Sequence, residues 1–189
     1  MESSFGPWVP IVALASVPVK PTRIKTLVNM RSPGGASLSD SPAVWVPPPV
    51  IYVAAIAGGA ILHKLLPLSI GGGLPRVLAA WAFVALWAVL LGISFYGFWN
   101  ARTSIVPIRP ATALVEKGAY RFTRNPMYVS LVALTLGVGL WMNTWWVIVL
   151  LVPAVVVIDR FVIAREEAYL RRRFGAEYEA YCQRVRRWL

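Results

Sequence analysis

The chain has very few of the side chains that most often bind metals or form cross-links. Its 189 residues include one cysteine, Cys182, and one histidine, His63. A single cysteine cannot form a disulfide within the chain. A lone histidine without a cysteine cluster argues against a zinc or other metal site. Any chemistry must therefore depend on an organic cofactor or on carboxylate, arginine, asparagine and tyrosine side chains.

Acidic residues are also scarce. Eight Asp and Glu oppose 19 Lys and Arg, which gives a net charge of +11. Such a balance occurs in proteins that bind nucleic acids, but here the basic residues flank uncharged apolar runs. That arrangement is typical of membrane proteins, whose basic loops lie in the cytoplasm and attract anionic lipid headgroups. We therefore expect membrane lipids as partners, and no nucleic acid.

The apolar content of the chain points to the same class. Hydrophobic residues make up 58% of the sequence, and the mean hydropathy is +0.62. An ordinary soluble domain is roughly 45–50% apolar. Nine tryptophans are present, and tryptophan collects at membrane–water interfaces. The composition therefore predicts an integral membrane protein.

Long uncharged runs predict four transmembrane helices. The first covers residues 49–66, uncharged from Val50 to Leu62 with Lys64 near its end, and the second covers residues 77–99. Each is close to the roughly 20 residues that cross a bilayer. Residues 127–158 are also uncharged, but 32 residues are too many for one straight span. We therefore expect a polytopic, all-α fold.

The third uncharged run is interpreted as a tight helical hairpin. Asn143 lies near its middle, flanked by tryptophans that should sit at the far membrane interface. Pro153 should kink the second arm of the hairpin. In the first span, Gly58 and Gly59 should allow another helix to pack closely.

The two ends of the sequence differ from the spans. Residues 1–44 contain scattered Pro, Gly and Ser and predict a disordered N-terminal extension, which leaves residues 45–189 as the membrane domain. Residues 159–189 carry eight arginines and five acidic residues. We expect an amphipathic helix there, broken or bent at Gly175. Its apolar stripe recurs at steps of three and four residues: Leu170, Phe174, Tyr178, Tyr181, Val185 and Trp188.

The distribution of basic residues predicts the topology. Five lie between the second and third spans, eight follow the fourth, and four precede the first. The positive-inside rule places all these regions in the cytoplasm. Two polar segments, residues 118–128 and 165–175, then share the cytoplasmic face. The hairpin between them should bring Glu166 close to Asn125.

The polar segments allow two interpretations. In the first, their arginines only mark topology, Asn125 and Pro126 only cap and start a helix, and the glutamates only pair with nearby arginines. In the second, they form a cofactor site. A carboxylate such as Glu166 suits an ammonium group, N–H groups at a helix start suit a carboxylate, and tyrosine rings suit an adenine or a sulfonium. S-adenosylmethionine carries all four groups, but the residues alone leave both interpretations open.

Two motifs in these segments narrow the choice. The first consists of Gly118-x-Tyr120 followed by Arg124-Asn125-Pro126-x-Tyr128. The second consists of Glu166-Glu167, Leu170, Phe174-Gly175, Glu177-Tyr178, Tyr181, Val185 and Arg187-Trp188. In their order and with the hairpin between them, they resemble the isoprenylcysteine carboxyl methyltransferase family, in its broad bacterial branch related to phospholipid methyltransferases.

The resemblance implies an S-adenosylmethionine-dependent enzyme of the bacterial cytoplasmic membrane, with its active site on the cytoplasmic side. The acceptor would be a lipophilic or membrane-associated small molecule, methylated on oxygen, nitrogen or sulfur. Arg124 and Asn125 would be catalytic, with Arg124 shaping the loop and supplying positive potential. The resemblance assigns cofactor binding to Thr112, Ala113, Leu114, Val115, Tyr120, Asn125, Pro126, Met127, Tyr128 and Glu166.

Departures from the family pattern limit the substrate prediction. Eukaryotic members often have histidine where this chain has Thr112 and Asn125, and an acceptor-binding arginine where it has Val162. We therefore do not expect a prenylcysteine carboxylate as the acceptor. A sterol-type reductase that binds NADPH and a non-catalytic small membrane protein remain the alternatives. The sequence identifies neither the acceptor, nor a general base, nor the oligomeric state.

Overall fold

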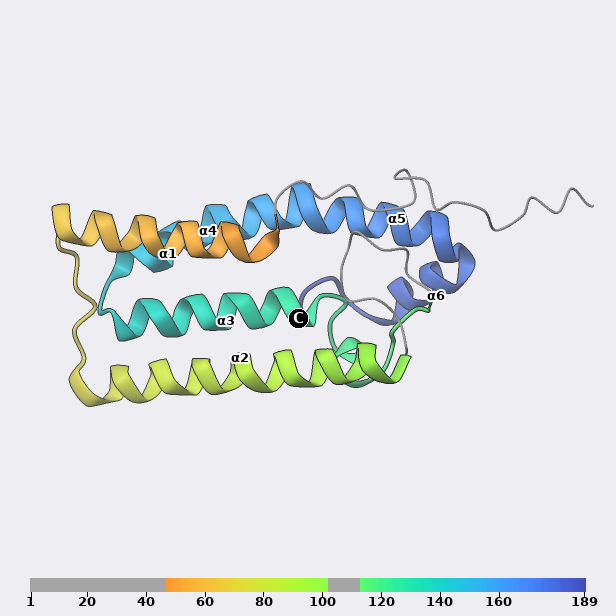
Figure 1. Ribbon diagram of the computed structural model, residues 1–189, viewed down its shortest axis with the longest axis horizontal. Helices are drawn as coiled ribbons and strands as arrows, with labels where there is room; N and C mark the ends of the chain where they lie inside the picture. The colour runs from red at the N-terminus through yellow and green to blue at the C-terminus, as the bar shows by residue number, and fades with distance from the viewer. Residues whose placement is uncertain (1–46, 102–112) are drawn as a thin grey trace, which may run out of the picture. The chain divides into compact units, whose positions relative to one another are not determined.

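A computed structural model describes residues 47–101 and 113–189 of the chain (Figure 1). The predicted extension at residues 1–44 lies outside these ranges, so its boundary stays a prediction. Within the described ranges all regular structure is helical, which confirms the all-α class. In chain order the elements are α1 (Pro48–Leu65), α2 (Gly73–Ala101), the 3₁₀ turn η2 (Gly118–Arg121), α3 (Pro126–Trp141), α4 (Trp145–Val157), the π-helical segment η3 (Ile158–Ile163), α5 (Ala164–Phe174) and α6 (Ala176–Arg184).

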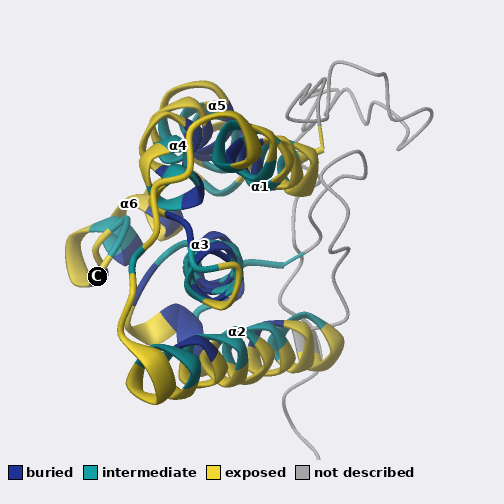
Figure 2. Ribbon diagram, turned by 90° about the vertical axis from the view of Figure 1, so that its left-hand side faces the viewer, coloured by how far each residue is buried: buried dark blue, intermediate teal, exposed yellow. Residues whose placement is uncertain are grey.

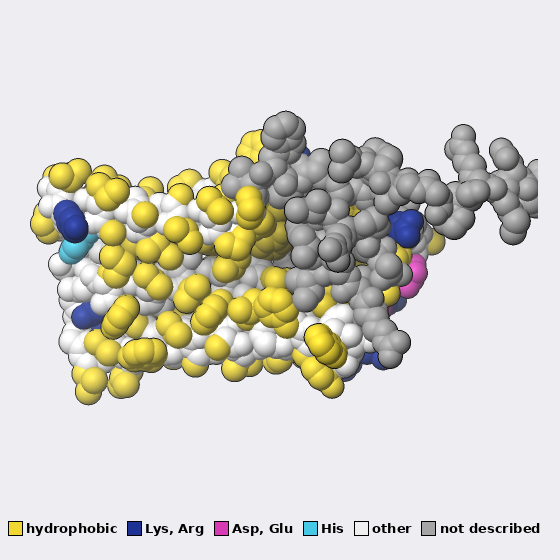
Figure 3. Space-filling model, viewed as in Figure 1, with side chains coloured by type: hydrophobic (Ala, Val, Ile, Leu, Met, Phe, Trp, Pro, Cys, Tyr) yellow, Lys and Arg dark blue, Asp and Glu magenta, His cyan; other side chains and the backbone are white. Residues whose placement is uncertain are grey.

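The predicted spans correspond to α1, α2, α3 and α4. Among the described residues, α1, most of α2 and the continuous helix Trp145–Phe174 are long and apolar enough to cross a membrane, and α3 is a shorter apolar helix. Hydrophobic side chains cover the middle of the bundle, whereas charged side chains gather at its two ends (Figure 3). The chain is therefore a membrane protein.

The helix α3 lies between α2 and the pair formed by α1 and α4 (Figures 1 and 2). Glycines allow the helices to approach closely. A Cβ on Gly59 would lie 2.6 Å from Cγ2 of Val147, and one on Gly137 would lie 3.0 Å from the carbonyl oxygen of Ala80. The predicted close packing at Gly59 therefore occurs, and its partner is α4.

The predicted hairpin is confirmed, because α3 ends at Trp141 and α4 begins at Trp145. Asn143 adopts a positive φ of 58°, and its side-chain oxygen accepts hydrogen bonds from the N–H groups of Ile70 and Gly71. Thr144 caps α4 by accepting a hydrogen bond from the N–H of Trp146 at 3.2 Å. The bonds of Asn143 join the loop between α1 and α2 to the loop between α3 and α4, at the end of the bundle opposite α5.

The tail differs in detail from the sequence-based expectation. The fourth span does not end at residue 158 but continues through η3 into α5, and Pro153 lies inside α4. The helix ends at Gly175, as the sequence suggested, where a φ of 53° favours glycine. The chain then folds back as α6. The apolar stripe is therefore divided among α5, α6 and the residues after α6, and its members Tyr178, Tyr181 and Val185 form one buried cluster.

Candidate active site

The two sequence motifs meet at one end of the bundle, where η2, the start of α3 and α5 lie together with α6 (Figure 1). The contact that joins them is a hydrogen bond from the Tyr128 hydroxyl to Oε1 of Glu166 at 2.8 Å. Tyr128 stands near the start of α3 and Glu166 near the start of α5. The predicted return of the hairpin to the same surface is therefore confirmed.

Glu166 has no ion-pair partner within the described part of the chain. The Tyr128 hydroxyl is the partner that the structure gives to its carboxylate. Tyr128 itself is 9% exposed and packs in a cluster with Tyr52, Ile158 and Val162. A half-buried carboxylate without a cation beside it is costly, so this group is suited to receive a positively charged ligand.

The adjacent Glu167 has the opposite environment. Its side chain is 4% exposed and lies 3.3 Å from Arg124. Arg187 donates two further hydrogen bonds to it, at 3.0 and 2.6 Å. Neighbouring residues of a helix point about 100° apart, so one glutamate enters this buried ion-pair network while the other faces Tyr128. The network leaves Glu166 as the carboxylate available to a ligand.

Tyr120 lies in η2 and is 8% exposed. The Tyr181 hydroxyl donates a hydrogen bond to the Tyr120 carbonyl oxygen at 2.8 Å, and the ring of Phe98 packs edge-on against the Tyr120 ring. Burial, followed by the nearby Tyr181 and Glu166, raises the pKa of the Tyr120 hydroxyl. Tyr120 therefore stays protonated near neutral pH, where it can donate a hydrogen bond but cannot act as a base.

Residues 185–189, here named the C-terminal strap, bind the side chain of one predicted catalytic residue, Asn125, and the backbone N–H of the other, Arg124. The amide of Asn125 donates to the carbonyl oxygen of Arg187 at 3.0 Å. The guanidinium of Arg124 contacts Glu167 and donates to the sulfur of Cys182. Both residues thus make contacts that hold segments of the chain together, and their catalytic roles stay predictions.

The start of α3 corrects one expectation. Pro126 is the first residue of the helix, as predicted, but the side chain of Asn125 does not cap it. The N–H groups of Tyr128 and Val129 donate to the Asn125 carbonyl oxygen, at 3.0 and 3.1 Å. The N–H of Asn125 donates to the hydroxyl of Thr123. The suitability of this helix start for a cofactor carboxylate stays a prediction. Met127, the next predicted ligand-binding residue, is half-buried.

The predicted segment before η2 is described only in part, because Thr112 lies outside the described residues. Ala113 and Leu114 are half-buried, and Val115 is 9% exposed. Leu114 packs against the cluster of Tyr178, Tyr181 and Val185. This segment therefore lies beside α6, and its predicted contact with the cofactor stays a prediction.

Two residues at this end, Asp159 and Tyr52, were not predicted from the sequence. Asp159 accepts hydrogen bonds from the Trp188 indole at 2.9 Å and from Arg187. It is the first charged residue after the long uncharged run, which is the signal that marked it. Tyr52 is the one tyrosine of the first predicted span. Its hydroxyl is buried, and it has no hydrogen-bond partner within the described ranges.

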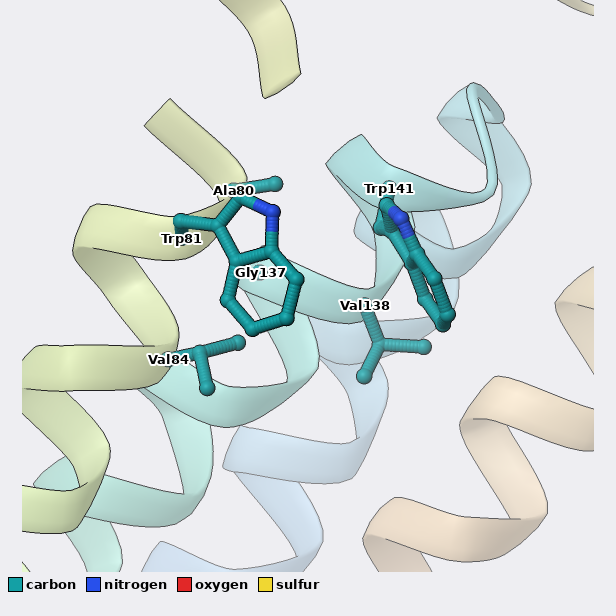
Figure 4. Close-up of a pocket in the computed structure, with 6 residues that line it drawn as sticks. All are labelled: Ala80, Trp81, Val84, Gly137, Val138 and Trp141. Carbon is teal, nitrogen blue, oxygen red and sulfur yellow. The ribbon is translucent and has the colours of Figure 1, made fainter. Parts of the chain in front are cut away.

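A small cleft at the opposite end of the bundle offers no comparable chemistry. It encloses about 190 Å³ between α2 and α3 (Figure 4). The rings of Trp81 and Trp141 flank it, with centroids 6.3 Å apart. Its remaining lining consists of Ala80, Val84, Gly137 and Val138. None of the described residues that line this cleft is charged. The end of the bundle that holds Tyr120, Tyr128 and Glu166 is therefore the candidate active site.

The fold and the site define a helical membrane protein with buried tyrosines at one end, beside a carboxylate that has no ion pair among the described residues. The model of the phospholipid methyltransferase family matches residues 75–177, which is more than half of the chain. The chain belongs to this family, which is also the family of the isoprenylcysteine carboxyl methyltransferase-like proteins, so the resemblance seen in the motifs is confirmed.

The other comparisons add little about function. A protein of Haemophilus influenzae, named only as an uncharacterized protein, is 44% identical over 63 residues, which are 33% of this chain and the whole of that protein. No solved structure matches the chain.

Proposed function

We propose that the chain transfers a methyl group from S-adenosylmethionine to a lipophilic acceptor in the membrane. Membership of a methyltransferase family supports the reaction class. The observation that carries the proposal for this site is the bond between Tyr128 and Glu166, because it joins the two motifs around a carboxylate that lacks an ion pair in the described chain.

The residues at this end fit the cofactor. The cofactor's ammonium would pair with the Glu166 carboxylate. A hydrogen bond of 2.8 Å from the Tyr128 hydroxyl holds this carboxylate in place. The ring of Tyr120 would lie against the adenine or the sulfonium, since aromatic faces attract cations. When bound, S-adenosylmethionine supplies a methyl group from its sulfonium, which becomes a neutral thioether as the acceptor forms the new bond and loses a proton.

The chain's own contribution is alignment and the exclusion of water. Burial keeps Tyr120 protonated, so we assign deprotonation to the acceptor's own acidity or to solvent. Asn125, Pro126, Met127 and residues 112–115 remain proposed contacts of the cofactor. The basic residues around the site favour its placement on the cytoplasmic side, where the charged cofactor would enter while the acceptor comes from the bilayer.

The proposal is tested by titrating the purified full-length protein with S-adenosylhomocysteine and, separately, with NADPH. We expect the first to bind and the second not to. Glu166→Gln should weaken binding, whereas Glu179→Gln, which changes an exposed carboxylate of α6, should not. Binding of NADPH alone would establish a reductase, and binding of neither compound would favour a non-catalytic protein.

Transfer itself is tested with S-adenosylmethionine labelled on its methyl group. The purified protein is incubated with vesicles made from a bacterial total lipid extract, and label is counted in the lipid phase. We expect incorporation that Glu166→Gln abolishes. Cofactor binding without label in the lipid phase would refute a lipid acceptor.

A further inference from the structure

The C-terminal strap joins the two halves of the candidate site. From the strap, the carbonyl oxygen of Arg186 accepts a hydrogen bond from the N–H of Arg124 at 2.9 Å. The carbonyl oxygen of Arg187 accepts bonds from the Thr123 hydroxyl at 3.1 Å and from the Asn125 amide at 3.0 Å. The strap is therefore fixed to the loop that precedes α3.

Side chains of the same strap bind the other half of the site, which consists of η3 and α5. The Arg187 guanidinium donates two bonds to Glu167 and also contacts Asp159. The indole of Trp188 donates to Asp159 at 2.9 Å and packs against the buried cluster beside Tyr128. Asp159 lies in η3 and Glu167 in α5, so these contacts span the segment that ends in Glu166.

We propose that Arg187 is a positioning residue for Glu166. Its planar guanidinium binds both oxygens of the adjacent Glu167, which fixes the rotation of α5 about its axis. That rotation determines whether Glu166 faces Tyr128. Together with Arg124, Arg187 also neutralises Glu167, so that one carboxylate, and not two, presents its charge to the ligand. The inference rests on the proposed function, because its readout is cofactor binding.

The sequence supplies a matched control at the adjacent residue. Arg186 carries the same charge, but its side chain is exposed, and it contributes to the strap through its backbone carbonyl. Arg186→Ala therefore removes one positive charge at the same place and leaves the strap bonds intact. Thr144→Ala, at the other end of the bundle, is a control for lowered stability alone.

The test measures the affinity of the four variants and the wild type for S-adenosylhomocysteine by titration, together with their melting temperatures. We expect Arg187→Ala to weaken binding by about tenfold or more, as loss of supporting contacts around a site commonly does. The affinity of Arg187→Lys should lie between those of the wild type and Arg187→Ala, because lysine cannot bind both carboxylate oxygens at once. Arg186→Ala and Thr144→Ala should stay within about twofold of the wild type.

Each outcome decides the question. Wild-type affinity in either Arg187 variant would overturn the inference, as would equal weakening by Arg186→Ala, which would show a charge effect alone. If Arg187→Ala does not fold, Arg187→Lys decides, because it retains the charge. A wild-type protein that binds no S-adenosylhomocysteine would instead refute the proposed function, and the inference would fall with it.

Discussion

Replacing Gly59 with alanine should force α1 away from α4. A Cβ at this position would lie 2.6 Å from Cγ2 of Val147, 2.7 Å from its backbone nitrogen and 2.8 Å from its Cα. Two of these three atoms are backbone, so they cannot rotate out of the way. The helices must separate, and they lose dispersion contacts along their interface.

The size of the effect follows from two opposing terms. Overpacking of a well-packed interior costs about 1–3 kcal/mol, whereas alanine gains about 1 kcal/mol over glycine inside a helix. We expect a net loss of up to about 2 kcal/mol in the free energy of unfolding. For a chain of this size a loss of that size lowers the melting temperature by up to about 8 °C.

Two other glycines provide the comparison, with melting of the purified protein in detergent as the assay. A Cβ on Gly92, in α2, would meet nothing within 4 Å, so Gly92→Ala should keep or raise the melting temperature. A Cβ on Gly58 would lie 3.1 Å from Cδ1 of Leu150, which is the flexible end of a side chain. The melting temperature of Gly58→Ala should therefore lie between those of Gly59→Ala and Gly92→Ala. If Gly59→Ala melts no lower than Gly92→Ala, the packing of α1 on α4 is wrong.

Three further substitutions test other parts of the structure by the same melting assay. Thr144→Ala removes the cap of α4 and should cost about 1 kcal/mol, while no change would show that the cap is not formed. Tyr181→Phe leaves the buried carbonyl of Tyr120 without its donor and should cost about 1–3 kcal/mol; a neutral result would contradict this contact. Glu167→Gln leaves two arginines without their carboxylate. Breaking a buried ion pair costs about 3–5 kcal/mol of stability. We expect a loss at the lower end of this range, because one of those arginines is 33% exposed. Its control, Glu179→Gln, removes an exposed pair worth about 0.2–1 kcal/mol, and an equal loss in both variants would show that the network around Glu167 is not buried.

The transmembrane part of the fold could be predicted because the hydropathy of the sequence determines where the spans lie. An uncharged run marks a span whatever its partners, so α1 lies within one residue of the predicted range at each end. The prediction of the hairpin followed from Asn143 and the tryptophans. The prediction that Glu166 returns to the surface of residues 118–128 followed from the two spans between them, but Tyr128 as its partner became evident only from the structure.

The structure of residues 159–189 was less predictable, because it depends on which face of each helix points inward. The π-helical segment at Ile158–Ile163 adds a wider turn between α4 and α5. Such a turn changes which face of the following helix points inward, and hydropathy does not reveal it. The sequence therefore showed two adjacent glutamates without showing that Glu167 enters an ion-pair network and that Glu166 does not.

The strap contacts lay beyond the reach of sequence for another reason. Three of its bonds end on the backbone carbonyl oxygens of Arg186 and Arg187, which every residue type carries. No side-chain pattern encodes such contacts. The motif Arg187-Trp188 was visible in the sequence, but its partners Asp159 and Glu167 became evident only from the fold.

Two polar segments that lie far apart in the sequence are proposed to make one ligand site through Tyr128 and Glu166. The most direct test is a double-mutant cycle on the affinity for S-adenosylhomocysteine, with Tyr128→Phe, Glu166→Gln and the double variant. Residues in contact show coupling energies of about 0.5–3 kcal/mol, and we expect about 1 kcal/mol or more here, with the double variant little worse than Glu166→Gln. Effects that add to within about 0.3 kcal/mol would contradict a shared site.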